Sequence, residues 1–253
     1  MSDTAENNHG VNLQVRGLRK SFNSQEVLKG IDFDVKAGEI FVIMGPSGSG
    51  KSVLLRHLIG LEPPDAGDIL INGEPIESTQ VVDKYRLAMV FQSGALLNSL
   101  TVGENVGIYL YEHRLKKPEE IEKIVSEKLR DVGLADAAAK TPAELSGGMR
   151  KRAAIARALV IEPQLILYDE PTSELDPLSA VVIGEEILKL KDRIGVTSLV
   201  VSHDRDLAFG IADRIAFIAD GRIVSVSSPD EMKHSNNPAI QKFLRADFKS
   251  ELK

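Results

Sequence analysis

The stretch VIMGPSGSGKSVLLR, residues 42–56, runs from an apolar strand through a glycine-rich turn into a helical pattern. Residues 45–52 fit the pattern G-x-x-x-x-G-K-[ST], in which glycines let backbone N–H groups turn inward around phosphate oxygens. The following helix directs its positive end at the same anion. We therefore predict a nucleoside triphosphate site, with the Lys51 ammonium group on the outer phosphates and the Ser52 hydroxyl on Mg²⁺. The predicted nucleotide contacts of this loop are Gly45, Pro46, Ser47, Gly48, Ser49, Gly50, Lys51, Ser52 and Val53.

An ordinary glycine–serine turn is the alternative for this loop, and the strand before it and the helix after it disfavour that alternative. The loop pattern does not distinguish a kinase, a GTPase or a motor protein. The rest of the chain has to supply that distinction.

The composition is typical of a soluble globular protein, with 253 residues, 43% hydrophobic and 27% charged. A formal net charge of −6 argues against a protein that mainly coats nucleic acid, so we expect no nucleic-acid partner. The chain has no cysteine, which excludes disulfides and thiolate metal sites. The polar start MSDTAENNHG lacks the features of a secretory signal, and no apolar run reaches the roughly 18 residues of a spanning helix. If the protein acts at a membrane, we expect another chain to cross it.

Strand patterns dominate the start and the end of the chain, and helical patterns dominate the middle, from about Thr101 to Pro163. Apolar strands that alternate with helices predict a parallel sheet covered on both faces, and the helical stretch predicts an inserted lobe. The predicted strands are 13–18, 31–40 and 41–44, separated by glycine turns, then 67–73, 86–92, 164–170 and 197–204, with a hairpin at 214–226 that turns at Asp220 and Gly221. The predicted helices include 51–59, 118–133 and 177–195.

Two neighbouring carboxylates follow the buried strand LILY, residues 165–168. Ligands of such sheets bind at the carboxyl ends of the strands, so Asp169 is a candidate to hold Mg²⁺. We predict that Glu170 points elsewhere and orients or deprotonates an attacking water. A solvated acidic turn before Pro171 is the alternative. A carboxylate in the position of Glu170 favours hydrolysis over a kinase reaction.

The segment AELSGGMRKRAAIARAL, residues 143–159, starts a helix with small residues. Ser146, Gly147 and Gly148 leave the backbone N–H groups of the first turn open to an anion. Taken alone, a plain helix cap with two flexible glycines explains these residues equally well. In chain order, however, GPSGSGKS, VFQ, LSGGM, LILYDEP, SELD and VVSHD together resemble the nucleotide-binding subunits of ABC transporters. The resemblance covers roughly residues 13–226.

This resemblance implies an α/β fold. Its P-loop NTPase core is a mostly parallel sheet with helices on both faces, joined by an N-terminal antiparallel β subdomain and an inserted helical lobe. It implies a single ABC ATPase domain over residues 1–253. The expected division is core and β subdomain in 11–92 and 163–226, helical subdomain in 93–162, and helical tail in 227–253.

The resemblance also implies ATP hydrolysis with ATP and Mg²⁺ as cofactors, and it assigns roles to single residues. Phe22 is similar to the aromatic residue that stacks on adenine, although a core role is the alternative. His203 resembles the switch histidine on the γ-phosphate, although a structural histidine is commoner at such a position. The implied catalytic residues are Glu170 as base, His203 and Lys51; the implied metal ligands are Ser52, Gln92 and Asp169; and the implied γ-phosphate and interface residues are Ser146, Gly147, Gly148, Met149 and the D-loop Asp176.

The chain has one phosphate loop and one signature segment, and in this family the two meet across an interface. The resemblance therefore implies a head-to-tail dimer of two copies with two ATP sites. It also implies integral-membrane permease subunits as partners. A non-catalytic regulatory module is disfavoured, because the residues of the hydrolytic machinery are all present.

Two segments, FQSGALLNSLTVGENV and ELSGGMRKRAAIARAL, look like those of MlaF-type ATPases, which serve Mla/Mce phospholipid transport systems of the Gram-negative envelope. That subfamily resemblance implies phospholipid cargo and a position on the cytoplasmic face of the inner membrane. It also implies an Mce-type lipid-binding protein and a small STAS-type regulatory subunit as partners. The alternatives are a transporter of amino acids, metals or lipoproteins, and a soluble ABC ATPase that acts on ribosomes or DNA.

Four further features carry expectations. Residues 93–97 form either a groove for a permease helix or a loop packed on the helical lobe. The arginines of the signature helix are interpreted as a solvated face, and Glu174 departs from the small residue that is common at its position. The tail 238–253 is expected to pack on its own domain, with a reach to the other protomer as the alternative. Its predicted apolar helical face consists of Ile240, Phe243, Leu244 and Phe248.

Overall fold

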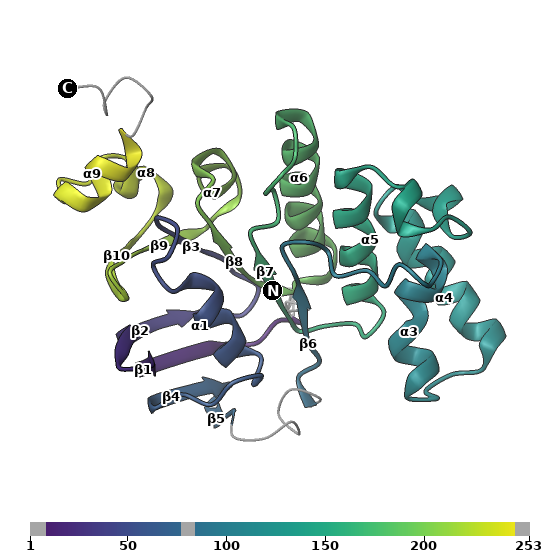
Figure 1. Cartoon of the computed structure of the whole chain (residues 1–253), viewed down its shortest axis with the longest axis horizontal. Helices are drawn as coiled ribbons and strands as arrows, with labels where there is room; N and C mark the ends of the chain where they lie inside the picture. The colour runs from purple at the N-terminus through teal and green to yellow at the C-terminus, as the bar shows by residue number, and fades with distance from the viewer. Residues whose placement is uncertain (1–8, 77–83, 246–253) are drawn as a thin grey trace, which may run out of the picture.

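The computed structural model describes residues 9–76 and 84–245 and arranges their strands in two sheets (Figure 1). The smaller sheet is antiparallel and has the strand order β2-β1-β4-β5. Its strands are β1 (Leu13–Phe22), β2 (Gln25–Val35), β4 (Ala66–Ile71) and β5 (Glu74–Pro75). The predicted antiparallel β subdomain is thereby confirmed. The β4–β5 turn has the expected Asn72 and Gly73, both with positive φ, 49° and 82°.

Of the glycine turns predicted between the first strands, the connection between β2 and β3 does turn at Gly38, with a φ of 74°, whereas the one between β1 and β2 is wrong. The β1–β2 hairpin turns instead at Asn23 and Ser24, with φ of 46° and 68°, the conformation that two-residue hairpin loops favour. Gly17 lies inside β1, where its φ of 55° accompanies a shift of register, so this glycine forms a bulge. The predicted strand 31–40 is also interrupted, because β2 ends at Val35 and a turn follows.

The larger sheet has the strand order β10-β9-β3-β8-β7-β6. Five of its strands run parallel and only the β9–β10 pair is antiparallel. The strands are β3 (Ile40–Met44), β6 (Leu87–Val90), β7 (Leu165–Asp169), β8 (Thr197–Ser202), β9 (Arg214–Ala219) and β10 (Arg222–Ser227). Every residue of β3, β7 and β8 is buried, as expected for parallel strands covered on both faces.

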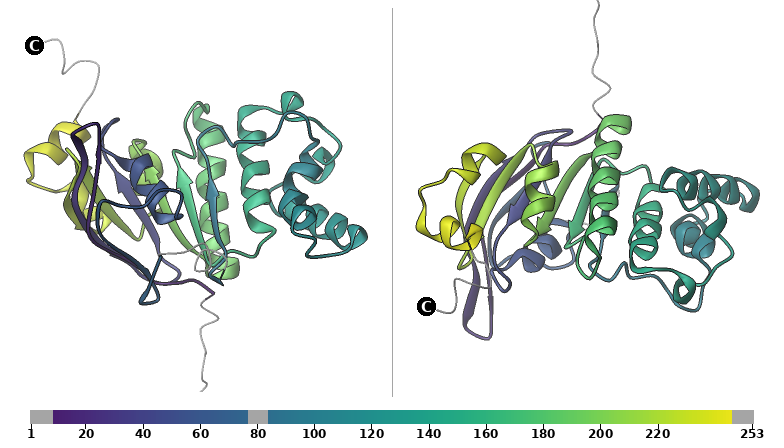
Figure 2. Two further views of the ribbon diagram at one scale, coloured as in Figure 1. Left: turned by 60° about the horizontal axis from the view of Figure 1, so that its bottom comes forward. Right: turned by 90° about the horizontal axis from the view of Figure 1, so that it is seen from above.

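Each face of this sheet has its own cover. Alternate residues of β3 point to the two faces. Val42 belongs to the hydrophobic core cluster that includes residues of α6 (Pro177–Ile194) and α7 (Arg205–Ile211). Phe41 lies in the cluster of α1 (Lys51–Leu58) and the antiparallel sheet. Figure 2 shows the antiparallel sheet and α6 on opposite sides of the larger sheet. The mostly parallel sheet with covered faces is as predicted.

The helices of the middle segment lie together at one end of the molecule, beyond β6 (Figures 1 and 2). They are α3 (Val102–Glu112), α4 (Pro118–Asp131) and α5 (Gly147–Leu159), with short 3-10 turns η1 (Ala135–Ala137) and η2 (Pro142–Glu144). Pro118 begins α4 as predicted, and Thr101 caps α3 in a capping box with Glu104. In the described part of the chain, no helix combines the length and apolar character needed to cross a membrane.

The tail forms α8 (Pro229–Lys233) and α9 (Pro238–Leu244) at the other end of the molecule (Figure 1). Ile240 is fully buried in the main core, and the Phe243 ring packs edge-on against Phe217 of β9 with 5.4 Å between centroids. The expected packing of the tail on its own domain is confirmed as far as Leu244. Phe248 lies outside the described residues.

Candidate functional site

The phosphate loop joins the carboxyl end of β3 to the start of α1. Gly48 and Gly50 have φ of 78° and 99°, a conformation that side chains with a Cβ rarely adopt. A Cβ on Gly50 would also lie 2.9 Å from Leu28 Cδ2 of β2. Local backbone freedom and contact with the antiparallel sheet therefore both require glycine in this loop.

Four side chains meet beside the loop. Lys51 Nζ donates to the carbonyls of Gly45 and Pro46, at 2.9 and 3.0 Å, and lies 3.5 Å from Glu170 Oε1. Ser52 Oγ donates to Asp169 Oδ1 at 2.9 Å. Residues 117 positions apart along the chain are thus in direct contact, because β3 and β7 both end at this edge of the sheet.

Burial sets the electrostatics of this cluster. Desolvation lowers the pKa of the Lys51 ammonium group, and the charge of Glu170 opposes that shift. Desolvation raises the pKa of Asp169, and the hydrogen bond from Ser52 opposes it. Burial removes water from both Lys51 and Asp169, and charged groups shifted in this way are typical of sites that bind charged ligands.

Glu170 is held from several directions. Its Oε2 accepts hydrogen bonds from the His203 backbone N–H at 3.1 Å, His203 Nδ1 at 2.8 Å and Ser202 Oγ at 3.3 Å. Its backbone has a φ of +46°, which is uncommon for a residue with a side chain. Glu170 and His203 therefore lie side by side at the ends of β7 and β8, next to Lys51.

ATP with Mg²⁺ fits the residues present here. Ser49 Oγ is buried in the loop and has no hydrogen-bond partner among the described residues, so a polar partner is missing where a phosphate oxygen would bind. The Ser52 hydroxyl and the Asp169 carboxylate offer adjacent oxygen donors, which suit Mg²⁺ shared with a phosphate. When bound, Mg²⁺ neutralises charge on the phosphates; Ser52 and Asp169 would hold it.

Phe22 and Gln92, which are also predicted to contact nucleotide or Mg²⁺, lie outside this cluster. Phe22 ends β1 and is 37% exposed, with Lys20 Nζ 5.6 Å from its ring centre. The same hairpin contacts the phosphate loop through Leu28. Gln92 follows β6 with an exposed side chain, and its backbone carbonyl accepts a hydrogen bond from Lys151.

The signature segment and the D-loop lie against each other. Ser146 Oγ caps α5 by accepting from the Met149 N–H at 3.3 Å, and Asp176 caps α6 by accepting from the Ser179 N–H at 3.0 Å. A Cβ on Gly147 would lie 3.2 Å from Leu175 Cδ2, and one on Gly148 would lie 3.4 Å from Ser179. Over residues 9–76 and 84–245, no hydrogen bond or ion pair joins 146–149 to the phosphate loop.

The solvated-face interpretation of the arginines is borne out for Arg150, which is exposed, and is wrong for Arg152 and Arg157, which are partly buried and donate to backbone carbonyls. Arg150 bonds to Leu145 O, Arg152 to Val132 O, and Lys151 to Gln92 O and Glu170 O. Arg157, further along α5, bonds to Gly94 O and Ala95 O at 2.8 and 2.6 Å. The sequence held a signal for the burial of Lys151, because Ala154, Ile155 and Ala158 share its helical face.

Sequence reasoning also missed two polar residues near Glu170. Ser202, the last residue of β8, donates to Glu170 and accepts from the Asp204 N–H at 3.0 Å. Thr172 Oγ1 donates to Asp204 Oδ2 at 2.8 Å, which ties the chain after β7 to the chain after β8. Ser202 lies within the segment VVSHD, in which the resemblance assigned a role only to His203, and Thr172 lies between the segments LILYDEP and SELD.

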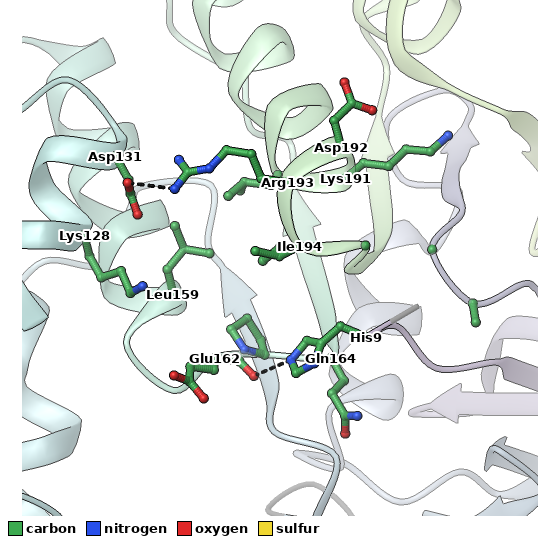
Figure 3. A pocket seen from close by; sticks show the side chains of 15 residues that line it. His9, Lys128, Asp131, Leu159, Glu162, Gln164, Lys191, Asp192, Arg193 and Ile194 are labelled. Atoms are coloured by element: carbon green, nitrogen blue, oxygen red, sulfur yellow. Dashed lines mark hydrogen bonds and ion pairs between the residues drawn. The ribbon is translucent and has the colours of Figure 1, made fainter. Parts of the chain in front are cut away.

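A cavity of about 1080 Å³ lies elsewhere, between the ends of α4 and α6 and the turn before β7 (Figure 3). Gly38 and Gln164, which line it, precede β3 and β7, so the cavity lies at the amino ends of these strands, opposite the phosphate loop. The Arg193–Asp131 ion pair, at 2.9 Å, and the contact of His9 Nε2 with Glu162 O, at 3.2 Å, lie on its wall. None of the predicted site residues lines it.

The phosphate loop at the carboxyl edge of a mainly parallel sheet, with Ser52 bonded to Asp169, defines a P-loop nucleoside triphosphatase. Comparison with known proteins gives the family. The ABC transporter family matches residues 28–173, and the chain belongs to this family as an ABC ATPase.

Three similar proteins illustrate the relationship. A probable ribonucleotide transport ATP-binding protein, mkl of Mycobacterium leprae, is 41% identical over 239 residues, which cover 93% of this chain and 69% of that protein. The intermembrane phospholipid transport system ATP-binding protein MlaF of Haemophilus influenzae is 37% identical, over 93% of this chain and 90% of that protein. The ATP-binding cassette MJ0796, solved as a dimer in a post-hydrolysis state with ADP and Pi, is 31% identical with a TM-score of 0.76, over 86% of this chain and 98% of that chain.

Proposed function

We propose that this ABC ATPase powers a permease that moves phospholipid between membranes of a Gram-negative envelope, from the cytoplasmic face of the inner membrane. The cluster of Lys51, Glu170 and His203, with Ser52 and Asp169 beside it, is the observation that supports ATP hydrolysis at this site. The similarity to the phospholipid-transport protein MlaF supports the cargo. The similarity to the ribonucleotide-transport protein mkl keeps ribonucleotides as a second candidate cargo.

The proposed chemistry is electrostatic stabilisation with one general base. Backbone N–H groups of residues 45–52 and the Lys51 ammonium group bind the phosphates and stabilise charge on the transferring phosphoryl group. Glu170 accepts a proton from the attacking water, and His203 contacts the γ-phosphate. Ser52, Gln92 and Asp169 hold Mg²⁺. Phe22 stacks on adenine, and its exposed ring leaves a face open for that contact.

The proposed assembly is a head-to-tail dimer in which the N-terminus of α5 contacts the nucleotide bound to the other copy. Ser146, Gly147, Gly148 and Met149 provide backbone N–H groups at that terminus, and Asp176 lies at the interface. The dimeric state of the MJ0796 structure supports this arrangement. Permease subunits, an Mce-type lipid-binding protein and a STAS-type regulatory subunit are the further proposed partners.

The proposed division of the chain follows its expected boundaries: core and β subdomain in 11–92 and 163–226, helical subdomain in 93–162, and tail in 227–253. Residues 93–97 are proposed to contact the permease. Leu97 in this segment is 48% exposed, and Asn105 bonds to both its N–H and its carbonyl. An ordered loop with an exposed apolar side chain supports a docking role for this segment.

The test of the catalytic proposal is Glu170→Gln in the full chain. We expect ATP binding to persist and turnover to fall by about 100-fold or more, because the amide cannot accept the proton. Lys51→Ala should instead weaken ATP binding, because it removes the charge inside the phosphate loop. Glu185→Gln on the exposed face of α6 is the matched control and should leave both unchanged. Wild-type turnover in Glu170→Gln would contradict the assigned base.

The cargo is tested separately. The protein is purified with its membrane partners in mild detergent, and bound lipids and nucleotides are identified by mass spectrometry. Enriched phospholipid supports the proposal, and ribonucleotide bound to a membrane partner without lipid refutes it.

A further inference from the structure

Lys151 is a buried charge that the proposed chemistry does not use. It lies in the second turn of α5, five residues after the signature serine, and is only 5% exposed. Its Nζ donates to the carbonyl of Gln92, to the carbonyl of Glu170 at 3.3 Å and to Ser173 Oγ at 3.2 Å. An ammonium group has three donors, and all three are used here.

The three acceptors belong to segments that are far apart in the sequence. Gln92 follows β6, Glu170 follows β7, and Ser173 lies in the D-loop before α6. The described structure gives Lys151 no carboxylate partner within ion-pair distance. Burial lowers the pKa of the Lys151 ammonium group, and the charges of Glu174, Asp169 and Glu170 oppose that shift. A buried cation that bonds to backbone oxygens fixes the positions of those oxygens, because leaving the charge unpaired is costly.

The backbone that Lys151 holds belongs to Gln92 and Glu170, to which the proposed function assigns roles. The peptide of Glu170 has a left-handed φ, and its carbonyl also accepts the Ser173 N–H at 3.1 Å. The other end of the same side chain bonds to His203 and lies near Lys51. The direction of the Glu170 carboxylate therefore depends on a strained backbone that Lys151 helps to hold.

We propose that Lys151 is a positioning residue of the ATPase site, whose ammonium group fixes the backbone of Gln92 and Glu170 to the signature helix. The proposal rests on the roles of Gln92 and Glu170 stated above. Because Ser146 and Lys151 lie on one short helix, the nucleotide contact of the signature and the orientation of the base are linked through a rigid element. Lys151 itself touches neither nucleotide nor water in this role.

The experiment compares Lys151→Met with Lys151→Arg and Arg152→Met in the full chain. Methionine keeps the length of the side chain and removes the charge. We expect kcat to fall by about tenfold to 100-fold with KM for ATP changed less than about threefold, because misplacing a catalytic group by about 1 Å has effects of that size. Lys151→Arg should recover part of kcat, since guanidinium also donates to carbonyls.

Arg152→Met is the matched control, because among the described residues Arg152 bonds only to Val132 O and Gly133 O, both within the helical lobe. It should lower the melting temperature while keeping kcat within about twofold. Hydrogen exchange of the peptide 171–175 should accelerate in Lys151→Met and not in Arg152→Met, since the Ser173 N–H bonds to the carbonyl that Lys151 holds.

The outcomes separate this inference from the proposed function. A Lys151→Met protein with kcat within about twofold of wild type overturns the positioning role, as does an equal loss of kcat in Arg152→Met. If Glu170→Gln keeps wild-type turnover, the catalytic assignment itself fails. Loss of turnover in Glu170→Gln together with unchanged turnover in Lys151→Met refutes only the role of Lys151.

Discussion

Substituting Gly45 by alanine tests why this position is glycine. A Cβ built on Gly45 would lie 2.2 Å from the carbonyl oxygen of Ile218 and 2.9 Å from its Cγ2. Ordinary contact begins near 3.4 Å, so the two backbones must separate by about 1 Å. Ile218 is fully buried in β9, which pairs with β3 on one side and β10 on the other. The neighbour therefore has little room to move.

We expect Gly45→Ala to lower the free energy of unfolding by about 3 kcal/mol, at the upper end of overpacking costs. Gly48→Ala is the matched control in the same loop. No atom of residues 9–76 and 84–245 lies within 4 Å of a Cβ there, so its left-handed φ of 78° is what opposes the side chain. That conformation costs about 1 kcal/mol, which leaves a difference of about 2 kcal/mol between the variants.

The assay is urea unfolding followed by far-UV circular dichroism, because the chain has no tryptophan. It is run without nucleotide, since bound ATP adds its own stabilisation. If Gly48→Ala is as destabilising as Gly45→Ala, close packing against β9 does not explain the glycine at position 45.

Two further variants test the electrostatics and the loop before α3. Burial raises the folded-state pKa of Asp169, so its ionised form weakens the fold, and the penalty disappears as the pH falls below the pKa of the unfolded chain. Asp169→Asn should therefore raise the melting temperature of the nucleotide-free protein at pH 7 and not at pH 3. The same substitution should abolish Mg²⁺-dependent turnover. A lower melting temperature of the variant at pH 7 contradicts the predicted penalty for burying the Asp169 carboxylate. Asn105→Ala removes the side-chain bonds to the Leu97 N–H and to the carbonyls of Leu97, Leu100 and Thr101, and it should cost about 2 kcal/mol, with faster proteolysis within 93–101. Unchanged urea unfolding refutes that role.

Much of the nucleotide site was predictable because its signals are local. The glycine spacing, Lys51 and Ser52 lie in one segment between a strand and a helix, and the continuous apolar run 165–168 predicted the strand that ends at Asp169. The resemblance to ABC transporter subunits added the family, which the comparisons confirm. The roles of Phe22 and of the signature remain predictions.

The predicted bounds of the first strands were less accurate. The predicted strand 13–18 is shorter than β1, which continues to Phe22, and Gly17 forms a bulge inside β1 with a left-handed φ. The actual turn uses Asn23 and Ser24, whose positive φ depends on the pairing of β1 with β2. Residues that pair between two strands can lie far apart along the chain, so a prediction from a few neighbouring residues does not include them.

Contacts between distant segments could not be derived in this way. The order of the strands around β3, the bond from Ser52 to Asp169, and the carbonyls around Lys151 join residues separated by many positions along the chain. Local sequence constrains dihedral angles and the face on which a side chain lies, whereas burial and hydrogen bonding depend on which faces meet when the chain packs. A lysine in a basic run therefore looks solvated along the chain and becomes a buried donor once β6, β7 and α5 pack together.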